Sequence, residues 1–486
     1  MSFPSGQDSS RARTRCPCPC RDWPRRQPRT RSRRVPRSST PDGAMTSAAA
    51  LRKSMNEGGA AASFCAGQAS FAARPQTGRS PDSTRAQYPA FVIFTALIAL
   101  AIKVVIALNT IGTNDVVTFY RFGQQLLHHG LEYSYRHDIA FNHPPLTAYY
   151  LETIYELDTD GVLRSFKINF PFLLRFPGIL SDFIVVLLLL QLNAKQGRLP
   201  FWLLALFAIS PVSIMVSGFH GNTDPVMVMF LVAASYMAAK ERPVLCALLF
   251  ALSCQVKIVP LLLLPIPFFF WLHRKRATRF AVTFSVVMVA LWAEPLLHSP
   301  APFLKSVLGY GSWWGIWGIT YWLRLTGLEA FSPVTFLNFT PPQAFVTNTL
   351  KAVIMLSIPL LAWRRRALSS EHFFASMGYA WLTFFAFSPG VCAQYMIWPA
   401  AFLLFTSPAI YLWTTGTSSL FLFFFYNITA AGLPWMFANS TARLNTVWTP
   451  WSVWPWLAIL GSLAICYRQL KSVHPALRLV SFQTAP

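Results

Sequence analysis

Acidic residues are concentrated in one segment of this sequence. Of the 18 Asp and Glu residues, 13 lie beyond residue 85, and seven of these fall within residues 109–169. Asp115 is the first of the seven, and Asp138 lies later in the same segment. A carboxylate can accept the proton of a hydroxyl group that attacks a substrate. Asp115 is therefore the leading candidate for a general base and Asp138 the alternative, although an acid at Asp115 would equally suit a helix N-cap.

Cations that could bind a phosphate come from distant parts of the chain. Lys257 follows an apolar segment and precedes Pro260, and Arg175 and Arg324 lie in or beside other apolar segments. A departing phosphate is stabilised by such cations. We expect at least one of the three to converge with Asp115 around one sugar, with Lys257 the best candidate. Arg175 and Asp182 are seven residues apart, on one face of a helix, which fits a structural clamp between helices equally well.

Other polar residues stand at turns between apolar segments. His143 precedes a proline pair, Asp224 lies in the turn 218–225, and Gln394 and Tyr395 lie in a later turn. Each is a candidate substrate contact. A solvated loop histidine and a helix-capping aspartate are the alternative interpretations of His143 and Asp224.

The composition indicates that most of the chain lies in a membrane rather than in water. Of 486 residues, 54% are hydrophobic and 12% are charged, against about 25% charged in an average globular protein. This excludes an ordinary soluble domain. The net charge of +23 does not indicate nucleic-acid binding, because residues 1–85 hold 16 of the 41 Lys and Arg and 5 of the 18 Asp and Glu, and so contribute +11.

Apolar windows of membrane-spanning length, about 20 residues, recur from residue 89 to residue 467. We predict an all-α, polytopic membrane protein with about twelve transmembrane helices, of which the fifth and sixth form a short or broken pair. The predicted spans are 89–108, 170–192, 199–216, 224–239, 243–257, 259–272, 280–297, 346–362, 371–387, 396–413, 418–437 and 451–467.

The Lys and Arg bias of the short loops gives an orientation. Cytoplasmic loops retain positive residues, which predicts cytoplasmic N- and C-termini and two long outer loops, 109–169 and 298–345. Apolar spacing in the first outer loop predicts an interfacial helix over 115–129 that stops at Gly130, and a second helix from Pro145. The second outer loop is rich in Trp around Arg324, which suits an aromatic belt and a sugar-stacking platform equally.

The chain divides into three predicted parts. Residues 1–85 are predicted to be a disordered basic tail because they are rich in Pro and Arg and poor in apolar residues; residues 1–44 could also be upstream sequence before the true start. Residues 86–470 form the transmembrane domain, and residues 471–486 form a short cytoplasmic tail.

Several motifs, taken in order, resemble the GT-C superfamily of polytopic glycosyltransferases over roughly residues 89–410. Residues 141–149, FNHPPLTAY, are similar to the Asp-Tyr-Pro-Pro-Leu-Thr-Ala-Tyr signature of the endoplasmic reticulum glucosyltransferases that use dolichyl-phosphate glucose. Residues 221–224, Lys257 and residues 394–395 are similar to bacterial polyprenyl-phosphate hexosyltransferases. The signature's Asp-Tyr is replaced by residues 142–143, Asn-His, so the contact made there by an acid is not carried over.

The resemblance implies inverting transfer of a hexose, glucose or mannose, from a polyprenyl-phosphate donor to a lipid-linked or cell-envelope acceptor on the non-cytoplasmic face. It implies no metal and no cofactor besides the donor substrate. It places the protein in the plasma membrane if the host is a bacterium and in the endoplasmic reticulum if the host is a eukaryote. Asp115 would be the base, and the substrate would be bound by Lys257, Arg175, Arg324, His143, Asp224, Gln394 and Tyr395. The alternative functions are a multi-span transporter or flippase and, less favoured, a structural scaffold.

Overall fold

A computed structural model describes residues 82–481, except 167, 310–312, 333–337 and 440–449. Residues 1–81 of the predicted basic tail therefore lie outside the described residues, and so do residues 1–44, for which upstream sequence was the alternative interpretation. Residues 82–85, assigned to that tail, instead form the beginning of the first helix.

The described part of the chain is almost entirely helical, which confirms the predicted all-α class. Besides the helices it contains two strands of two residues each, β1 (Gly112–Thr113) and β2 (Phe437–Ala438), which pair in parallel. The α-helices are α1 Asp82–Asn109, α2 Asn114–His137, α3 Pro145–Thr159, α4 Phe170–Gln196, α5 Phe201–Ala208, α6 Pro211–Ser213, α7 Asp224–Ala239, α8 Pro243–Val256, α9 Pro265–His273, α10 Ala277–His298, α11 Pro300–Leu308, α12 Gly318–Leu325, α13 Pro341–Arg365, α14 Phe373–Phe387, α15 Ala400–Thr406, α16 Pro408–Thr429 and α18 Val453–Ser481.

Short irregular helices join these elements. One is a π-helix, η2 (Ile214–His220), which extends the short helices α5 and α6 toward the site described below. The others are 3₁₀-helices: η1 Leu163–Phe166, η3 Val259–Leu263, η4 Glu329–Phe331, η5 Ser370–His372, η6 Ala393–Ile397 and η8 Pro450–Ser452.

Five described helices are long and apolar enough to cross a membrane, so a polytopic fold is supported but twelve spans are not confirmed. Five shorter apolar helices accompany them. The predicted fifth and sixth spans are indeed interrupted, since α8 ends at Val256 and η3 and α9 follow. The five long helices are Pro89–Asn109, Phe170–Gln196, Phe201–His220, Ala277–His298 and Pro341–Arg365.

The tenth and eleventh predicted spans are wrong in their boundaries. The helix ends after α15, where Ser407 adopts an extended conformation. A new helix, α16, then begins at Pro408 and continues without interruption to Thr429. The sequence remains apolar through this break, so hydropathy placed the boundary between 413 and 418. Proline at the first helical position explains the restart at 408.

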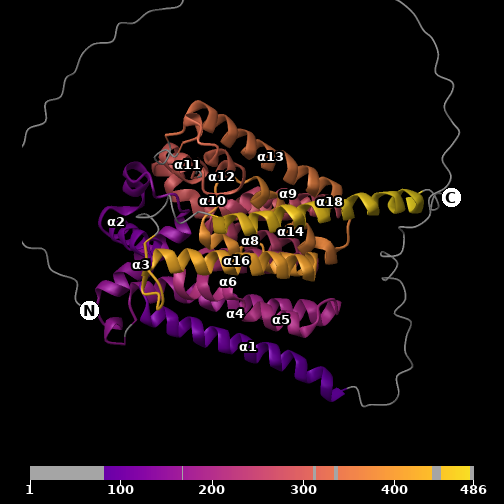
Figure 1. Cartoon of the computed structure of the whole chain (residues 1–486), viewed down its shortest axis with the longest axis horizontal. Helices are drawn as coiled ribbons and strands as arrows, with labels where there is room; N and C mark the ends of the chain where they lie inside the picture. Colours follow the sequence, from indigo (N-terminus) through magenta and orange to yellow (C-terminus); the bar gives the residue numbers. More distant parts are fainter. Residues whose placement is uncertain (1–81, 167, 310–312, 333–337, 440–449, 482–486) are drawn as a thin grey trace, which may run out of the picture. The chain divides into compact units, whose positions relative to one another are not determined.

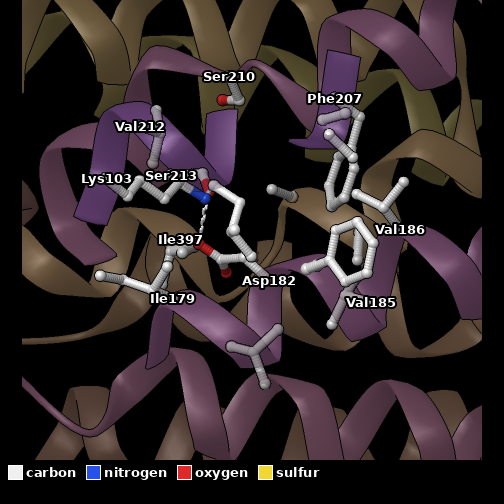
Figure 2. Close-up of a pocket in the computed structure, with 17 residues that line it drawn as sticks. Lys103, Ile179, Asp182, Val185, Val186, Phe207, Ser210, Val212, Ser213 and Ile397 are labelled. Carbon is white, nitrogen blue, oxygen red and sulfur yellow. Dashed lines mark hydrogen bonds and ion pairs between the residues drawn. The ribbon is translucent and has the colours of Figure 1, made fainter. Parts of the chain in front are cut away.

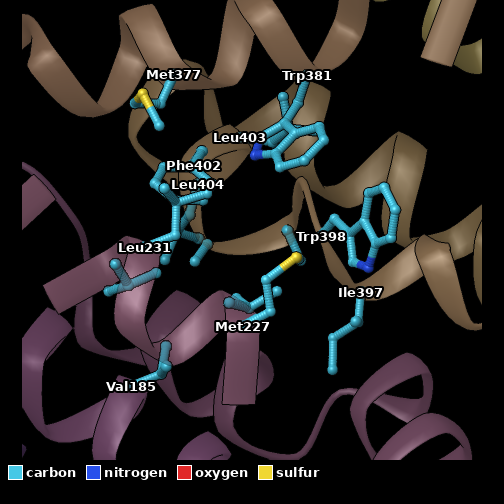
Figure 3. Close-up of a cluster of buried hydrophobic side chains, with 14 of the residues drawn as sticks. Val185, Met227, Leu231, Met377, Trp381, Ile397, Trp398, Phe402, Leu403 and Leu404 are labelled. Atoms are coloured by element: carbon cyan, nitrogen blue, oxygen red, sulfur yellow. The ribbon is translucent and has the colours of Figure 1, made fainter. Parts of the chain in front are cut away.

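The long helices lie alongside one another, and α2, α3, α11 and α12 gather at one end of them (Figure 1). The interior is centred on α14, in which every residue from Phe373 to Ala386 is buried. Figure 3 shows Met377 and Trp381 of α14 beside side chains of α7 and α15, including Met227 and Phe402.

A second, smaller core holds the predicted interfacial helices together. Phe119 and Phe122 of α2 pack with Phe141, Leu151 of α3 and Phe303 of α11. The sequence predicted that the first of these helices stops at Gly130. This residue does leave the helical conformation, with φ +80°, but the helix resumes beyond it and α2 ends at His137. The second predicted helix begins at Pro145 as expected.

A buried ion pair joins α1 to α4. Lys103 Nζ lies 2.6 Å from Asp182 Oδ2, and both contact the Ser213 hydroxyl at 2.6 Å. Figure 2 shows these three side chains pointing toward one another at a cavity of about 30 Å³. Asp182 therefore holds helices together through Lys103, and the alternative of an Arg175–Asp182 clamp is wrong.

Candidate functional site

Asp115 stands at the start of α2, where the strand pair β1–β2 fixes the chain. The backbone amides of Ile111 and Gly112 donate to the Met436 carbonyl at 2.9 and 3.3 Å, just before the strands pair. Thr113 is the N-cap, and its hydroxyl accepts a hydrogen bond from the Asp115 amide. The capping interpretation of Asp115 is therefore wrong, and its carboxylate is available for other contacts.

Three donors converge on one oxygen of this carboxylate. Asp115 Oδ2 lies 3.1 Å from His220 Nε2, 3.0 Å from Asn222 Nδ2 and 3.3 Å from Gln394 Nε2. The side chain is 30% exposed, and no described residue donates to Oδ1. One oxygen is thus held in place while the other is available to a ligand.

His220 links Asp115 to the interior. Its Nδ1 lies 2.8 Å from the hydroxyl of Tyr426 in α16, which is fully buried. In the neutral imidazole, Nε2–H donates to Asp115 and Nδ1 accepts the tyrosine proton. The hydrogen-bonded series Tyr426–His220–Asp115 therefore orients the carboxylate from the protein interior.

Two glycines allow the turn that carries His220 to approach α2. Gly221 has φ +82°, and a Cβ there would lie 2.3 Å from a methyl group of Val116. Gly112 has φ +101°, and its Cβ would lie 2.6 Å from the Phe219 carbonyl oxygen. Glycine provides both the backbone conformation and the space. The approach brings His220 and Asn222 within reach of Asp115.

Arg175 is almost completely buried and contacts the backbone of the turn that carries His220. Its guanidinium donates to the carbonyl oxygens of Gly218 and Phe219 at 3.1 and 3.2 Å, and to those of Ala107 and Thr110 at the end of α1. It also donates to the Thr110 hydroxyl and to the Pro171 carbonyl, both at 2.8 Å. This environment indicates that Arg175 positions the His220 turn; a phosphate contact stays only a prediction.

Lys257 and Asp224 form a second polar pair in the same cluster. Lys257, at the C-cap of α8, places Nζ 2.7 Å from Oδ1 of the fully buried Asp224. Trp398 Nε1 donates to the same oxygen at 2.9 Å. One interpretation of the sequence was that Asp224 caps α7. Instead, its carboxylate pairs with Lys257, and α7 has no side-chain cap.

An aromatic wall lies beside the lysine. Its ammonium is 4.8 Å from the ring centroid of Tyr395 and 5.5 Å from that of Trp398, and the two rings stack at 3.9 Å. The Lys257 side chain is 14% exposed, and Asp224 is its one hydrogen-bond acceptor among the described residues. Two of its three N–H donors remain for a ligand.

The surroundings of Asp115 keep it ionised. Burial raises its pKa, but the hydrogen bond and electrostatic attraction of His220, the charge of Lys257 and the hydrogen bond from Asn222 outweigh this, so the pKa lies below the ordinary value of 3.8. At neutral pH Asp115 is a carboxylate. Lys257 is thus close enough to lower the pKa of Asp115 electrostatically, and the convergence of the two around one sugar stays a prediction.

His143 lies in the same electrostatic environment, buried among aromatic rings. Its ring meets Phe119 edge-on at 5.0 Å, and its carbonyl accepts a hydrogen bond from the Tyr135 hydroxyl. Burial and the charge of Lys257 lower its pKa to about 3, against a smaller opposing effect of Asp115. His143 is therefore neutral at physiological pH, and no described residue hydrogen-bonds its ring nitrogens.

Arg324 and two tryptophans of the predicted second outer loop donate hydrogen bonds to backbone carbonyls. Arg324 donates to the Gly315 carbonyl at 3.2 Å and is not among the described groups that contact Asp115. Trp317 is fully buried and donates to the Phe385 carbonyl, and Trp314 donates to the Phe331 carbonyl. Trp314 and Trp317 therefore pack inside the protein, whereas Trp322 is 45% exposed and fits an aromatic belt.

Asp138, the alternative base, has a local structural role. It pairs with Arg121 at 3.1 Å, and its other oxygen accepts the Ala140 amide at 2.9 Å. Both carboxylate oxygens are thus engaged in the turn after α2.

The sequence analysis singled out the turn 218–225 for Asp224 and did not identify Tyr426 or Trp398. The turn containing residues 220–224 carried a detectable signal in its polar composition. Tyr426 carried none, since it lies in an apolar helix 206 positions from His220.

The polar cluster lacks the ligand set of a metal site. No group of three or more His, Cys, Asp or Glu side chains with metal-binding geometry occurs in residues 82–481 outside the undescribed gaps. The absence of a metal requirement stays a prediction.

Comparison with known proteins identifies one matching family. Residues 161–274 match the family described as Alpha-(1->6)-mannopyranosyltransferase, N-terminal domain. The matched segment runs from η1 to the end of α9 and contains Arg175, His220, Asp224 and Lys257, but not Asp115. No curated protein matches the chain significantly.

Proposed function

We propose that this protein is a membrane-embedded glycosyltransferase that moves mannose from a polyprenyl-phosphate donor to a lipid-linked or cell-envelope acceptor, with inversion, at the non-cytoplasmic face. The carrying observation is that the Asp115 carboxylate and the partly exposed Lys257 belong to one cluster, to which four distant parts of the chain contribute. The match over residues 161–274 supports mannose over glucose.

In the proposed reaction, the acceptor hydroxyl oxygen attacks C1 of the mannosyl group from the side opposite the phosphate. The C1–O bond to the phosphate breaks, and its electron pair stays on the polyprenyl phosphate. The hydroxyl proton passes to Asp115 Oδ1 as the new bond forms. Attack opposite the leaving group inverts the configuration at C1.

Lys257 is proposed to bind the departing phosphate. Its two unused N–H donors can contact phosphate oxygens while the third stays on Asp224. Donors fixed before the reaction stabilise developing charge without reorganisation. The Tyr395 ring beside the ammonium offers a surface on which the sugar can stack.

The uncharged polar groups are proposed to bind sugar hydroxyls. The Gln394 amide donates to Asp115, and the ring nitrogens of the neutral His143 have no hydrogen-bond partner among the described residues. A neutral histidine can donate to and accept from hydroxyl groups, whereas it adds no charge to attract phosphate. Arg324 and Arg175 lack a described contact with Asp115, and we do not include them in the proposed donor site.

The proposal is tested with membrane vesicles prepared from a host with and without the full chain. Vesicles receive polyprenyl-phosphate mannose or polyprenyl-phosphate glucose, each radiolabelled in the sugar. We expect a labelled product that depends on the chain and forms from the mannose donor. Labelling from glucose alone would contradict mannose specificity, and passage of intact donor across the vesicle without product would favour the transporter alternative.

A further inference from the structure

A cavity of about 400 Å³ lies between the turn that joins α7 to α8 and the beginning of α10. α7 starts at Asp224 and has 16 residues, a length of about 24 Å. The cavity is therefore at the other end of α7 from the proposed donor site, on the predicted cytoplasmic side. Its charged lining residues are Arg242, Arg276, Arg279 and Glu241.

The lining has an excess of positive charge. Glu241 is shared between Arg276 at 3.8 Å and Arg274, outside the lining, at 4.0 Å. Arg242 and Arg279 are exposed and have no ion-pair partner among the residues that the structure describes. One carboxylate therefore faces three arginines, two of which have unused guanidinium donors suited to phosphate oxygens.

Two helices add to the same potential. Arg242 and Arg276 occupy the N-cap positions of α8 and α10, of 14 and 22 residues, and neither helix receives a side-chain cap. Helix N-termini carry a partial positive charge. Because the first residues of both helices line the cavity, both ends reinforce the field of the arginines.

The remaining wall of the cavity is apolar and open. Val244 and Leu245 line it and are 48% and 44% exposed. A free anion would leave these side chains uncovered, whereas a lipid carries hydrocarbon directly below its phosphate. We propose that this cavity binds the phosphate headgroup of an anionic phospholipid, whose acyl chains lie against Val244 and Leu245. The site is separate from the proposed donor site and does not depend on the proposed function.

The test uses the full chain in detergent and native mass spectrometry to count bound lipid during titration. The probes are short-chain phosphatidylglycerol, phosphatidylcholine of the same chain length, and inorganic phosphate. The variant R242Q/R279Q removes the two unpaired arginines. The matched control R364Q/R366Q removes two arginines that do not line the cavity. They lie near the same end of the helices, because the nearby Leu368 carbonyl accepts a hydrogen bond from Arg274.

We expect phosphatidylglycerol to bind in preference to phosphatidylcholine and R242Q/R279Q to weaken it roughly 30-fold, from the typical contribution of each basic residue near an anionic surface. R279Q alone should weaken it roughly fivefold, which keeps the test decisive if the double variant does not fold. R364Q/R366Q should bind like the wild type.

Three results would overturn the proposal. Equal binding of the two lipids would show that the arginines serve membrane orientation only. An equal loss in R364Q/R366Q would show a general charge effect. Displacement of phosphatidylglycerol by an equal concentration of inorganic phosphate would assign the cavity to a free anion.

Discussion

His220 Nε2 lies 3.1 Å from Asp115 Oδ2, although 105 positions separate the two residues in the chain. Asn222 and Gln394 donate to the same oxygen. The contacts fix one carboxylate oxygen, and the other is the one that the proposed acceptor hydroxyl would meet. Asp115 is therefore oriented before any substrate binds, as a general base requires.

The D115N variant should lose transfer activity while remaining folded. An amide has no basic oxygen to take the acceptor proton, and general-base catalysis typically contributes about 10²–10⁴-fold. The measurement is the rate of labelled product formation in vesicles. D138N is the matched control, because Asp138 pairs with Arg121 in the turn after α2. Full activity of D115N, or equal losses in both variants, would remove the assignment of Asp115.

The pH profile should depend on His220. Burial raises the pKa of Asp115, and His220 provides the largest opposing effect. H220F should therefore raise the pKa of this carboxyl, so that the acid limb of kcat/KM moves to higher pH than in the wild type. Y426F keeps the His220–Asp115 contact and serves as the control, with its acid limb unmoved. An unchanged limb in H220F would mean that Asp115 does not govern the rate.

Arg175 can be distinguished as a positioning residue by separating kcat from KM. R175K keeps a positive charge but cannot reach the carbonyls of Gly218 and Phe219 together with those of α1. We expect kcat to fall roughly 10–100-fold, the typical cost of small misplacements of catalytic groups, with little change in donor KM. The opposite result, a raised donor KM with unchanged kcat, would support the phosphate contact predicted from the sequence.

The types and surroundings of residues indicated much of the candidate site. Asp115, Lys257 and Asp224 were identifiable because charges beside apolar segments need a partner or a cavity, and the structure brings them into one cluster. Spacing on one helix identifies a face but not the partner across from it. Asp182 shares a face with Arg175 but pairs with Lys103 of another helix.

Long-range contacts account for what sequence reasoning missed. The Tyr426 hydroxyl reaches His220 only because α16 packs beside η2, and nothing near Tyr426 in the chain indicates this. The break before Pro408 was missed for a different reason, since apolar residues continue through it and hydropathy averages over the break. Sequence patterns therefore predicted the helical class and the polar turns better than the pairing of helices.

His143 should make stability depend on pH. Its pKa is lowered to about 3 in the folded protein by burial and by Lys257, against about 6.5 in the unfolded chain. Between these values the unfolded state binds one more proton, so stability falls as pH decreases from about 6.5 toward 3, by at most about 1.4 kcal/mol per pH unit. Thermal unfolding of H143N should lose this dependence. H129N, which removes an exposed histidine of α2, should keep it, and equal behaviour of the two variants would contradict the prediction.

The last prediction separates the two roles of Lys257, which holds Asp224 and is proposed to bind the donor phosphate. K257M leaves a carboxylate that is fully buried without its cation, and should cost about 3–5 kcal/mol of unfolding free energy. K257M/D224N removes both charges, and the amide oxygen that replaces the carboxylate would still accept the Trp398 N–H. Stability should therefore recover in the double variant, measured by thermal or denaturant unfolding in detergent.

Transfer activity should not recover with it, because no ammonium remains for the departing phosphate. D224N alone is the control, since it keeps the lysine and removes only its partner. Recovery of both stability and activity in K257M/D224N would show that Lys257 is needed only to neutralise Asp224. Loss of activity in a double variant as stable as the wild type would leave the phosphate contact as the role of this lysine.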